Sequence, residues 1–300
     1  MQPKLIALEK TFNASTLTKI DDAVLERQHI ELWIKRDDLL HPVISGNKWR
    51  KLKYILDDAL SLGCNTLISM GGAYSNHLHA LAYAGKALGL HTTGLIRREC
   101  PEPLTPTLQD MRDWGMQLEF VSRSDYRQLR CYQGRQDLPG IRPGQYWIPE
   151  GGAQPLALAG IAELVSEITL PYDVLCVPCG TGTTLAGIIK AAPVHASIIG
   201  YPVLKHAGFL ISDLEKMLDR PHSNWQLKLD YHFGGFAKTN AALIAFVNDF
   251  ETKTGIPIEP VYTGKMLYAI YDLIAKQYFK PGLKMIAVHT GGLQGKRGFS

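Results

Sequence analysis

Short apolar runs alternate with segments of helical pattern along most of this chain, and this alternation constrains the fold more than any other feature. Repeated strand–helix order is typical of a mostly parallel sheet that helices cover on both faces. The predicted strands are 30–34, 66–69, 92–96, 117–121, 174–177, 196–200, 226–231 and 284–289. The predicted helices are 48–62, 76–88, 104–114, 155–168, 183–191, 208–218, 240–252 and 264–277. The fold class we expect is therefore α/β, in three layers.

A chain of 300 residues is too long for one compact core, and its length indicates about two domains. The segment Ser122–Trp147 breaks the alternation because it is rich in Arg, Gln, Gly and Pro, and we expect a surface connection there. The prediction is a large cofactor-binding domain made of 1–53 plus 155–300. A smaller α/β domain, 54–154, would be inserted into it.

Composition excludes several classes of function. The net charge is only +4, from 32 Lys+Arg against 28 Asp+Glu, and no basic run exceeds two residues, so nucleic acid is not an expected partner. No apolar run is long enough to span a bilayer, and the first residues do not form a signal peptide. Five sparse cysteines fit a reducing compartment, so the predicted location is cytoplasmic. We expect no membrane partner.

Two apparent motifs are set aside. Cys176 and Cys179 have the spacing of a redox pair, but the first lies in an apolar strand, so burial is the better interpretation. His77 and His79 have no Cys or acidic partner at ligand spacing, so no metal site is expected.

The turn after strand 174–177 is the first whose residues could bind a ligand. Its sequence, Cys-Gly-Thr-Gly-Thr-Thr, opens a helix, so that glycines, hydroxyls and free N–H groups would surround an anion. It lacks the lysine of a nucleotide-binding P-loop. An ordinary tight turn with no ligand is an equally good interpretation of this turn alone. Its candidate ligating residues are Gly180, Thr181, Gly182, Thr183 and Thr184.

Four other turns share this character. Lys48 follows Gly46-Asn47 at a helix start, whose positive end favours a nucleophilic amine, although a lone lysine is usually solvated surface. Ser75 is a natural N-cap that could equally present its hydroxyl to a carboxylate. The remaining two turns are 260–265 and 289–292. Because all five lie after strands or at helix starts, they indicate one shared site for a phosphate-bearing cofactor.

Taken in order, these motifs resemble the pyridoxal-phosphate enzymes of fold type II, the tryptophan-synthase-β type. The branch they resemble most contains 1-aminocyclopropane-1-carboxylate (ACC) deaminase and D-cysteine desulfhydrase. The resemblance extends from Lys35-Arg36-Asp37-Asp38 to His289-Thr290-Gly291-Gly292, and its most specific part is Gly46-Asn47-Lys48-x-Arg50-Lys51-Leu52. It implies two α/β domains, pyridoxal 5'-phosphate as cofactor, and a lyase or deaminase that acts as a homodimer on a small amino acid.

The resemblance also assigns roles. Lys48 matches the lysine that forms the Schiff base with the cofactor and moves the α-proton, and its neighbour Asn47 belongs to the same cofactor-binding motif. Asn76 matches the asparagine that contacts the ring oxygen of the cofactor. Ser75 and His77 match the loop that holds the substrate carboxylate, with Ser75 also a candidate for proton handling. The turn Gly180–Thr184 matches the phosphate cradle.

Three further positions concern the substrate side and the cofactor ring. Tyr262 matches a tyrosine that is suited to proton transfer. ACC deaminases carry Glu directly after this tyrosine and Leu after the histidine of the His-x-Gly-Gly turn, but here these positions are Thr263 and Thr290. Both threonines resemble the D-cysteine desulfhydrase pattern. A neutral hydroxyl near the ring makes a weaker electron sink than a carboxylate would, which can suffice when sulfide leaves.

The sequence departs from the family at Phe236, where a second substrate-side tyrosine is usual, and at His79, which is commonly Arg. The function expected is α,β-elimination, with D-cysteine giving pyruvate, sulfide and ammonia. The alternatives are ACC deaminase, giving 2-oxobutyrate and ammonia, another amino-acid lyase or β-replacement enzyme, and a non-catalytic protein that binds pyridoxal phosphate or another phosphate compound.

Overall fold

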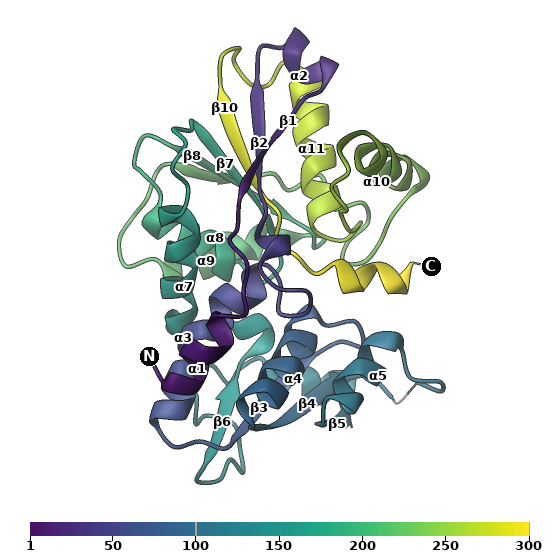
Figure 1. The fold of residues 1–300 in the computed structure, drawn as a ribbon. Helices are drawn as coiled ribbons and strands as arrows, with labels where there is room; N and C mark the ends of the chain where they lie inside the picture. Colours follow the sequence, from purple (N-terminus) through teal and green to yellow (C-terminus); the bar gives the residue numbers. More distant parts are fainter. Residues whose placement is uncertain (100, 300) are drawn as a thin grey trace. The chain divides into compact units, whose positions relative to one another are not determined.

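The computed structural model describes residues 1–99 and 101–299 and divides the chain into two compact units (Figure 1). The first unit contains 1–13, 40–160 and 294–300, and the second contains 14–39 and 161–293. Each unit has its own sheet, with helices on both faces. Among the helices of the described residues, none is long and apolar enough to cross a membrane.

The first unit is built on a four-stranded sheet in which every neighbouring pair is parallel. Its strand order is β5-β4-β3-β6. The strands are β3 (Thr66–Gly71), β4 (His91–Arg97), β5 (Met116–Val121) and β6 (Gln145–Ile148). Because all four run in the same direction, the turns that follow them lie along one edge of the sheet.

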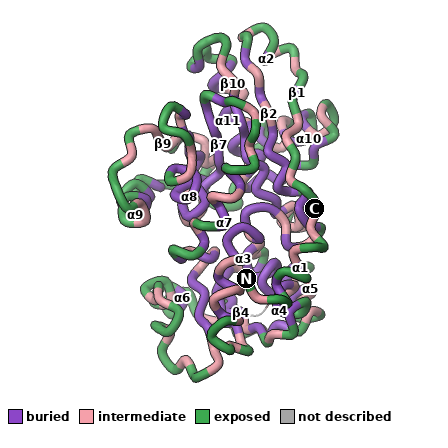
Figure 2. Tube along the Cα trace, turned by 60° about the vertical axis from the view of Figure 1, so that its left-hand side comes forward, coloured by how far each residue is buried: buried purple, intermediate pink, exposed green. Residues whose placement is uncertain are grey.

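Alternate residues of these strands point to opposite faces, and each face has its own core. Leu67 and Ile96 lie in the larger core, with the helices α1 (Pro3–Glu9), α3 (Asn47–Ser61), α4 (Asn76–Leu88) and α5 (Pro106–Asp113). Ile68 and Leu95 pack on the other side, in a cluster that includes residues of α6 (Arg123–Leu129). Figure 2 shows the buried residues concentrated along the strands and the helix faces that meet them.

The second unit contains a six-stranded sheet of order β1-β2-β10-β7-β8-β9. Only β1 is antiparallel to its neighbour. The strands are β1 (Leu17–Ile20), β2 (Glu31–Lys35), β7 (Val174–Cys179), β8 (Ser197–Pro202), β9 (Trp225–Leu227) and β10 (Lys284–Val288). The buried run of β7 needs apolar side chains on both faces, which explains its continuous apolar sequence.

Helices cover both faces of this sheet as well. Ile199 and Tyr201 of β8 share a core with α2 (Ala23–Arg27), α10 (Ala241–Thr254) and α11 (Thr263–Ala275). Gly200, between them in sequence, faces Leu185 of α8 (Thr183–Ala191) on the opposite side. The remaining helices are α7 (Pro155–Ser166), which begins in the first unit and ends in the second, and α9 (Leu210–Met217). Short 3-10 turns occupy 37–39, 150–152, 207–209 and 293–298.

The division of the chain differs from the predicted boundaries of 1–53 plus 155–300 and 54–154. Leu5 and Leu8 of α1, with Leu52 of α3, lie in the core of the first unit. The N-terminal helix and residues 40–53 therefore belong to the smaller sheet rather than to the larger one. Residues 294–300 also belong to the first unit.

The predicted surface connection at 122–147 was wrong for part of its length. It contains α6 and begins β6, so it supplies a helix to one face of the sheet and an edge strand. Tyr126 and Trp147, 2% and 0% exposed, are the apolar residues that anchor this segment.

Candidate active site

The residues predicted for the site form two groups, one on each unit. The first unit carries Asn47, Lys48, Ser75, Asn76 and His77. The second carries Gly180, Thr181, Gly182, Thr183, Thr184, Phe236, Tyr262, Thr263 and Thr290. All of them except Phe236, which lies in the loop between β9 and α10, are in turns that follow strands or begin helices.

Lys48 lies in the first turn of α3. The helix starts after Gly46, whose φ of 64° is a conformation that glycine adopts without strain. The Nζ of Lys48 donates a hydrogen bond of 2.6 Å to Oδ1 of Asn47. Lys48 is half-buried, and the neighbouring side-chain amide orients its amine.

Lys51 is one turn further along α3 and is buried rather than at the surface. Its Nζ donates a 2.6 Å hydrogen bond to the carbonyl of Gly151. Burial, together with the positive charge of Lys48, lowers the pKa of Lys51 well below its usual value.

The turn between β3 and α4 depends on the absence of a side chain at Gly71. A Cβ at Gly71 would lie 2.6 Å from the Cβ of Ser75, so any side chain there would displace Ser75. Ser75 caps α4, and its Oγ accepts a hydrogen bond of 3.2 Å from the N–H of Leu78. This cap satisfies one N–H group at the start of α4; a helix start has further N–H groups that can bind an anion, as the carboxylate interpretation needs.

Asn76, the first residue of α4, has a partner from the far end of the chain. Its Oδ1 accepts a hydrogen bond from Nε2 of Gln294, and the Oε1 of Gln294 accepts one of 2.5 Å from Thr107. Gln294 lies in the 3-10 turn near the C-terminus, so the C-terminal segment orients the side chain of Asn76.

His77 is buried and its protonation can be assigned. The hydroxyl of Ser69 donates to the carbonyl of Ile148 at 2.7 Å, so at 2.9 Å it accepts from Nε2–H of His77. Burial and the charges of Lys51 and Lys48 lower the pKa of His77 well below its usual value. The ring is therefore neutral, and its Nδ1 is a buried acceptor for which the described residues supply no partner.

The turn after β7 joins a glycine of positive φ to a helix start and two threonine hydroxyls. Gly182 has a φ of 80° and precedes the first residue of α8. The hydroxyls of Thr181 and Thr183 are 3.0 Å apart, at the N-terminal end of the helix. A Cβ at Gly180 would lie 3.4 Å from the Tyr262 ring, so the turn and Tyr262 are close neighbours.

Glu259 positions Tyr262 and Thr263. This carboxylate is 1% exposed and accepts hydrogen bonds from three successive backbone N–H groups, of Val261 at 2.7 Å, Tyr262 at 2.8 Å and Thr263 at 2.6 Å. Burial raises the pKa of Glu259, while the backbone N–H groups and Lys265 act in the opposite direction. All the groups it contacts in these bonds are donors, which requires an acceptor carboxylate.

The hydroxyl of Thr263 is buried, yet the described part of the protein offers it no hydrogen-bond partner. A buried hydroxyl without a partner normally lowers the free energy of unfolding of a protein by about 1–3 kcal/mol. Buried polar groups in folded proteins are nearly always hydrogen-bonded, so this hydroxyl is a group that a bound polar atom could satisfy.

Phe236 is 48% exposed, and its ring centroid lies 6.0 Å from that of Tyr262 in an edge-to-face arrangement. Lys265 holds the loop that carries it: Nζ donates to the carbonyls of His232 at 2.9 Å and Gly235 at 2.8 Å. Burial lowers the pKa of Lys265 to about 8, although Glu259 opposes this shift.

Thr290 is buried next to His289, in the turn after β10. Nε2 of His289 lies 2.8 Å from the carbonyl of Pro257, while Nδ1 accepts from the N–H of Gly291 at 3.1 Å. The ring is thus a neutral tautomer that shapes the turn, and burial lowers its pKa.

Sequence reasoning missed Glu259, Lys265 and Gln294, which fix the positions of predicted site residues.

Burial raises the pKa of both Cys176 and Cys179 to about 12, which keeps the thiols protonated. Within 1–99 and 101–299, no group of three or more His, Cys, Asp or Glu side chains is placed to hold a metal ion.

The chain is similar to known proteins over nearly its full length. A Pyrococcus horikoshii protein, provisionally assigned as an ACC deaminase, is 31% identical, over 98% of this chain and 96% of its own. The mitochondrial bifunctional D-cysteine desulfhydrase/ACC deaminase of Arabidopsis thaliana is 30% identical, over 88% of this chain and 73% of its own. The crystal structure of an ACC deaminase homologue superposes with a TM-score of 0.81 at 28% identity, over 99% of this chain and 97% of that one.

The similarity to that crystal structure confirms the predicted fold. The sequence profile of the family described as "Pyridoxal-phosphate dependent enzyme" matches residues 17–291. That match covers more than half of the chain and confirms the predicted cofactor and the enzymatic nature of the protein. The chain therefore belongs to the family of pyridoxal-phosphate-dependent enzymes.

Proposed function

We propose that this protein catalyses α,β-elimination on a small amino acid, with D-cysteine as the preferred substrate. The observation that carries the proposal is the buried, unpartnered hydroxyl of Thr263 at the position where ACC deaminases have a carboxylate. Net reaction would convert D-cysteine and water to pyruvate, sulfide and ammonia.

The described residues fit pyridoxal phosphate. The Thr263 hydroxyl supplies a neutral partner for the ring nitrogen, and the unpartnered atom is what such a contact would satisfy. The turn Gly180–Thr184, with its hydroxyls and helix N-terminus, suits the phosphate. Asn76 would contact the ring oxygen, and Lys48 would hold the cofactor covalently, next to Asn47. When bound, pyridoxal phosphate withdraws electrons from the carbon next to the amino group, so that its proton can leave.

The chain's own groups would bind the substrate and move the proton. The N–H groups at the start of α4, with Ser75, would hold the substrate carboxylate. Nζ of Lys48 would take the α-proton, with the hydroxyl of Ser75 or Tyr262 as the second proton donor or acceptor. His77 would hold this turn in place through the hydrogen bond between its ring and Ser69, and its lowered pKa favours an uncharged ring.

The choice between the two substrates rests on Thr263 and Thr290. A carboxylate at position 263 would keep a ring nitrogen protonated, whereas a hydroxyl makes a weaker electron sink. Sulfide is a good leaving group and tolerates this. Opening a cyclopropane ring that has no α-proton to lose is harder, so the threonines favour D-cysteine.

ACC deaminase activity is the second candidate, and one observation favours it: the relative from Pyrococcus horikoshii carries that assignment. The homodimer and the cytoplasmic location stay predictions from the sequence.

The test is sulfide release by purified, cofactor-loaded protein, with D-cysteine, L-cysteine and ACC assayed in parallel. We expect sulfide from D-cysteine alone. A double variant, Thr263→Glu with Thr290→Leu, should lose most of this activity, whereas Thr92→Val, at a buried threonine in β4, should keep it. Release of 2-oxobutyrate from ACC, with no sulfide from D-cysteine, would reverse the substrate assignment. No turnover of any of the three would refute both assignments and indicate another small amino acid as the substrate.

A further inference from the structure

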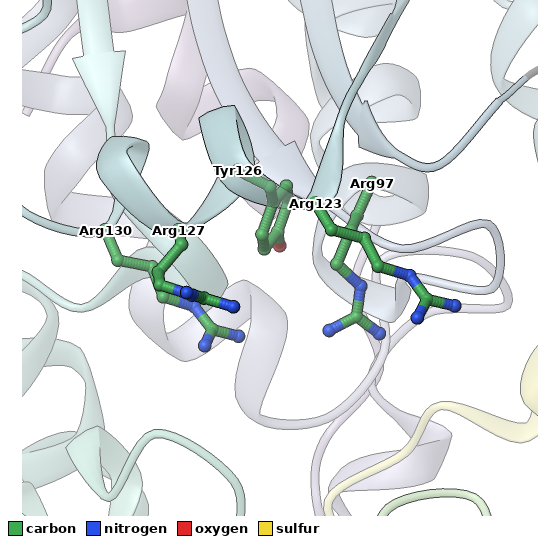
Figure 3. A pocket seen from close by; sticks show the side chains of 5 residues that line it. All are labelled: Arg97, Arg123, Tyr126, Arg127 and Arg130. Carbon is green, nitrogen blue, oxygen red and sulfur yellow. The ribbon is translucent and has the colours of Figure 1, made fainter.

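A hollow of about 360 Å³ on the first unit is lined by four arginines and one tyrosine. Arg97 ends β4, and Arg123, Arg127 and Arg130 come from α6 and the residue after it. Figure 3 shows the guanidinium groups of Arg127 and Arg130 on one side and those of Arg97 and Arg123 on the other, with Tyr126 between them. This volume is in the range of small-molecule sites.

The positive charge of this arginine pocket is mostly unbalanced. Glu150 is bound by Arg130, at 2.7 Å, and by the hydroxyl of Tyr126, at 2.6 Å. Among the described residues, no carboxylate forms an ion pair with Arg97, Arg123 or Arg127. Like charges gathered around a hollow repel one another, so the arrangement becomes favourable when an anion lies between them.

Tyr126 holds two of the arginines in place. Its ring is 2% exposed, with the guanidinium carbons of Arg97 and Arg130 at 5.5 and 5.4 Å from its centroid. These are cation–π distances, and they restrict the arginine side chains before any ligand binds. A site that is ordered in advance loses less entropy on binding.

The arginine pocket is separate from the substrate-binding turn. Tyr126 belongs to the core on one face of the sheet, together with Met70 and Leu95. Leu78 and Leu81 of α4, the helix that begins with Asn76, belong to the core on the opposite face. A ligand in the pocket would thus bind beside the active-site turn of the same sheet without occupying it.

We propose that the arginine pocket binds a small soluble compound that carries two or more phosphate groups, such as a nucleoside diphosphate. The planar fork of arginine matches phosphate oxygens in pairs, and three to four guanidinium groups suit more than one phosphate. The hollow encloses a small molecule rather than a strand, and the chain has no extended basic run, which disfavours nucleic acid. The proposed amino-acid substrates carry no phosphate, so this compound would be a second ligand.

The test is calorimetric titration of the cofactor-loaded protein with inorganic pyrophosphate at low ionic strength, with ADP and inorganic sulfate as further probes. We expect one pyrophosphate per chain, binding that weakens as salt is added, and weaker binding of sulfate. Arg123→Gln and Arg127→Gln should each weaken binding about 10-fold, because each removes a charged hydrogen-bond donor. Both side chains are exposed and lack carboxylate partners, so the folded state should be kept, which thermal unfolding will check.

The matched control is Arg142→Gln, an exposed arginine elsewhere in the same unit, which should bind pyrophosphate like the wild type. Absence of saturable binding by pyrophosphate and by ADP would overturn the proposal. So would equal weakening by the control, or loss of the cofactor's visible absorbance during the titration, which would place the anion at the cofactor's phosphate cradle instead. Binding to anionic lipid vesicles, with none of pyrophosphate, would point to a membrane ligand and refute a soluble one.

Discussion

Replacing Thr263 by valine tests whether its hydroxyl gains a hydrogen-bond partner only when the cofactor is bound. The side chain is 0% exposed and the described residues give its Oγ1 no partner, so the cofactor-free protein buries an unsatisfied hydroxyl. That burial typically costs about 1–3 kcal/mol, and valine has nearly the same shape. Cofactor-free Thr263→Val should therefore unfold with a free energy about 1 kcal/mol higher than the wild type. With pyridoxal phosphate the sign should reverse, because the variant loses a hydrogen bond to it and binds it roughly 10-fold more weakly.

Thr107 is a matched control, since it too is 0% exposed but its hydroxyl donates to Gln294 at 2.5 Å. Thr107→Val should lower the free energy of unfolding by about 1 kcal/mol, opposite in sign to cofactor-free Thr263→Val. Urea denaturation followed by circular dichroism measures both. If cofactor-free Thr263→Val is destabilised as much as Thr107→Val, the hydroxyl of Thr263 has a protein partner and the reasoning fails.

Three further changes probe the site. Lys48→Ala should abolish turnover and remove the visible absorbance of the bound cofactor, and an active variant with unchanged colour would refute the role of Lys48. Gly71→Ala should destabilise the fold by about 1–3 kcal/mol and raise KM, because a Cβ would lie 2.6 Å from that of Ser75; Gly72→Ala, with nothing within 4 Å, should be silent in both assays. Since burial lowers the pKa of Lys265 to about 8 from 10.5, the unfolded chain binds more protons between these pH values. The free energy of unfolding of the wild type, relative to that of Lys265→Met, should thus rise from pH 8 to 10.5 in denaturation curves. A difference that does not change with pH would contradict the lowered pKa of Lys265.

Much of the fold follows from local signals in the sequence. Strand β7 reads as a continuous apolar run, and α5 begins at a proline whose fixed φ suits a first turn, after the N-cap Thr105. The segment 122–147 was misjudged because its many Arg, Gln and Gly residues conceal two anchors, Tyr126 and Trp147. Its helix and strand depend on packing against β3 and β4, which no local pattern indicates.

The unit boundaries and several site contacts were also hard to predict, because they depend on contacts between residues far apart in the sequence. Leu5 packs in the core with α4, and Gln294 reaches Asn76 across 218 positions of the sequence. Turn glycines and cap residues can be recognised because their requirement is local. A residue such as Glu259 cannot, since its sequence neighbours do not show that all its hydrogen bonds point inward.

Two buried charged residues of the second unit, Glu259 and Lys265, each fix the backbone of one segment. Glu259 binds the turn 261–263, and Lys265 binds the loop 232–235. Taking both ions from water is costly, and their mutual attraction alone seldom offsets it. Here the carboxylate accepts hydrogen bonds from three N–H groups at and just before the start of α11, and the ammonium group donates to two carbonyls of the loop before Phe236. The desolvation of each charge is thereby compensated by backbone groups whose positions it then fixes. Tyr262 and Phe236 are consequently held edge to face, so a change at position 236 can alter the surface next to Tyr262 without disturbing the backbone that presents Thr263.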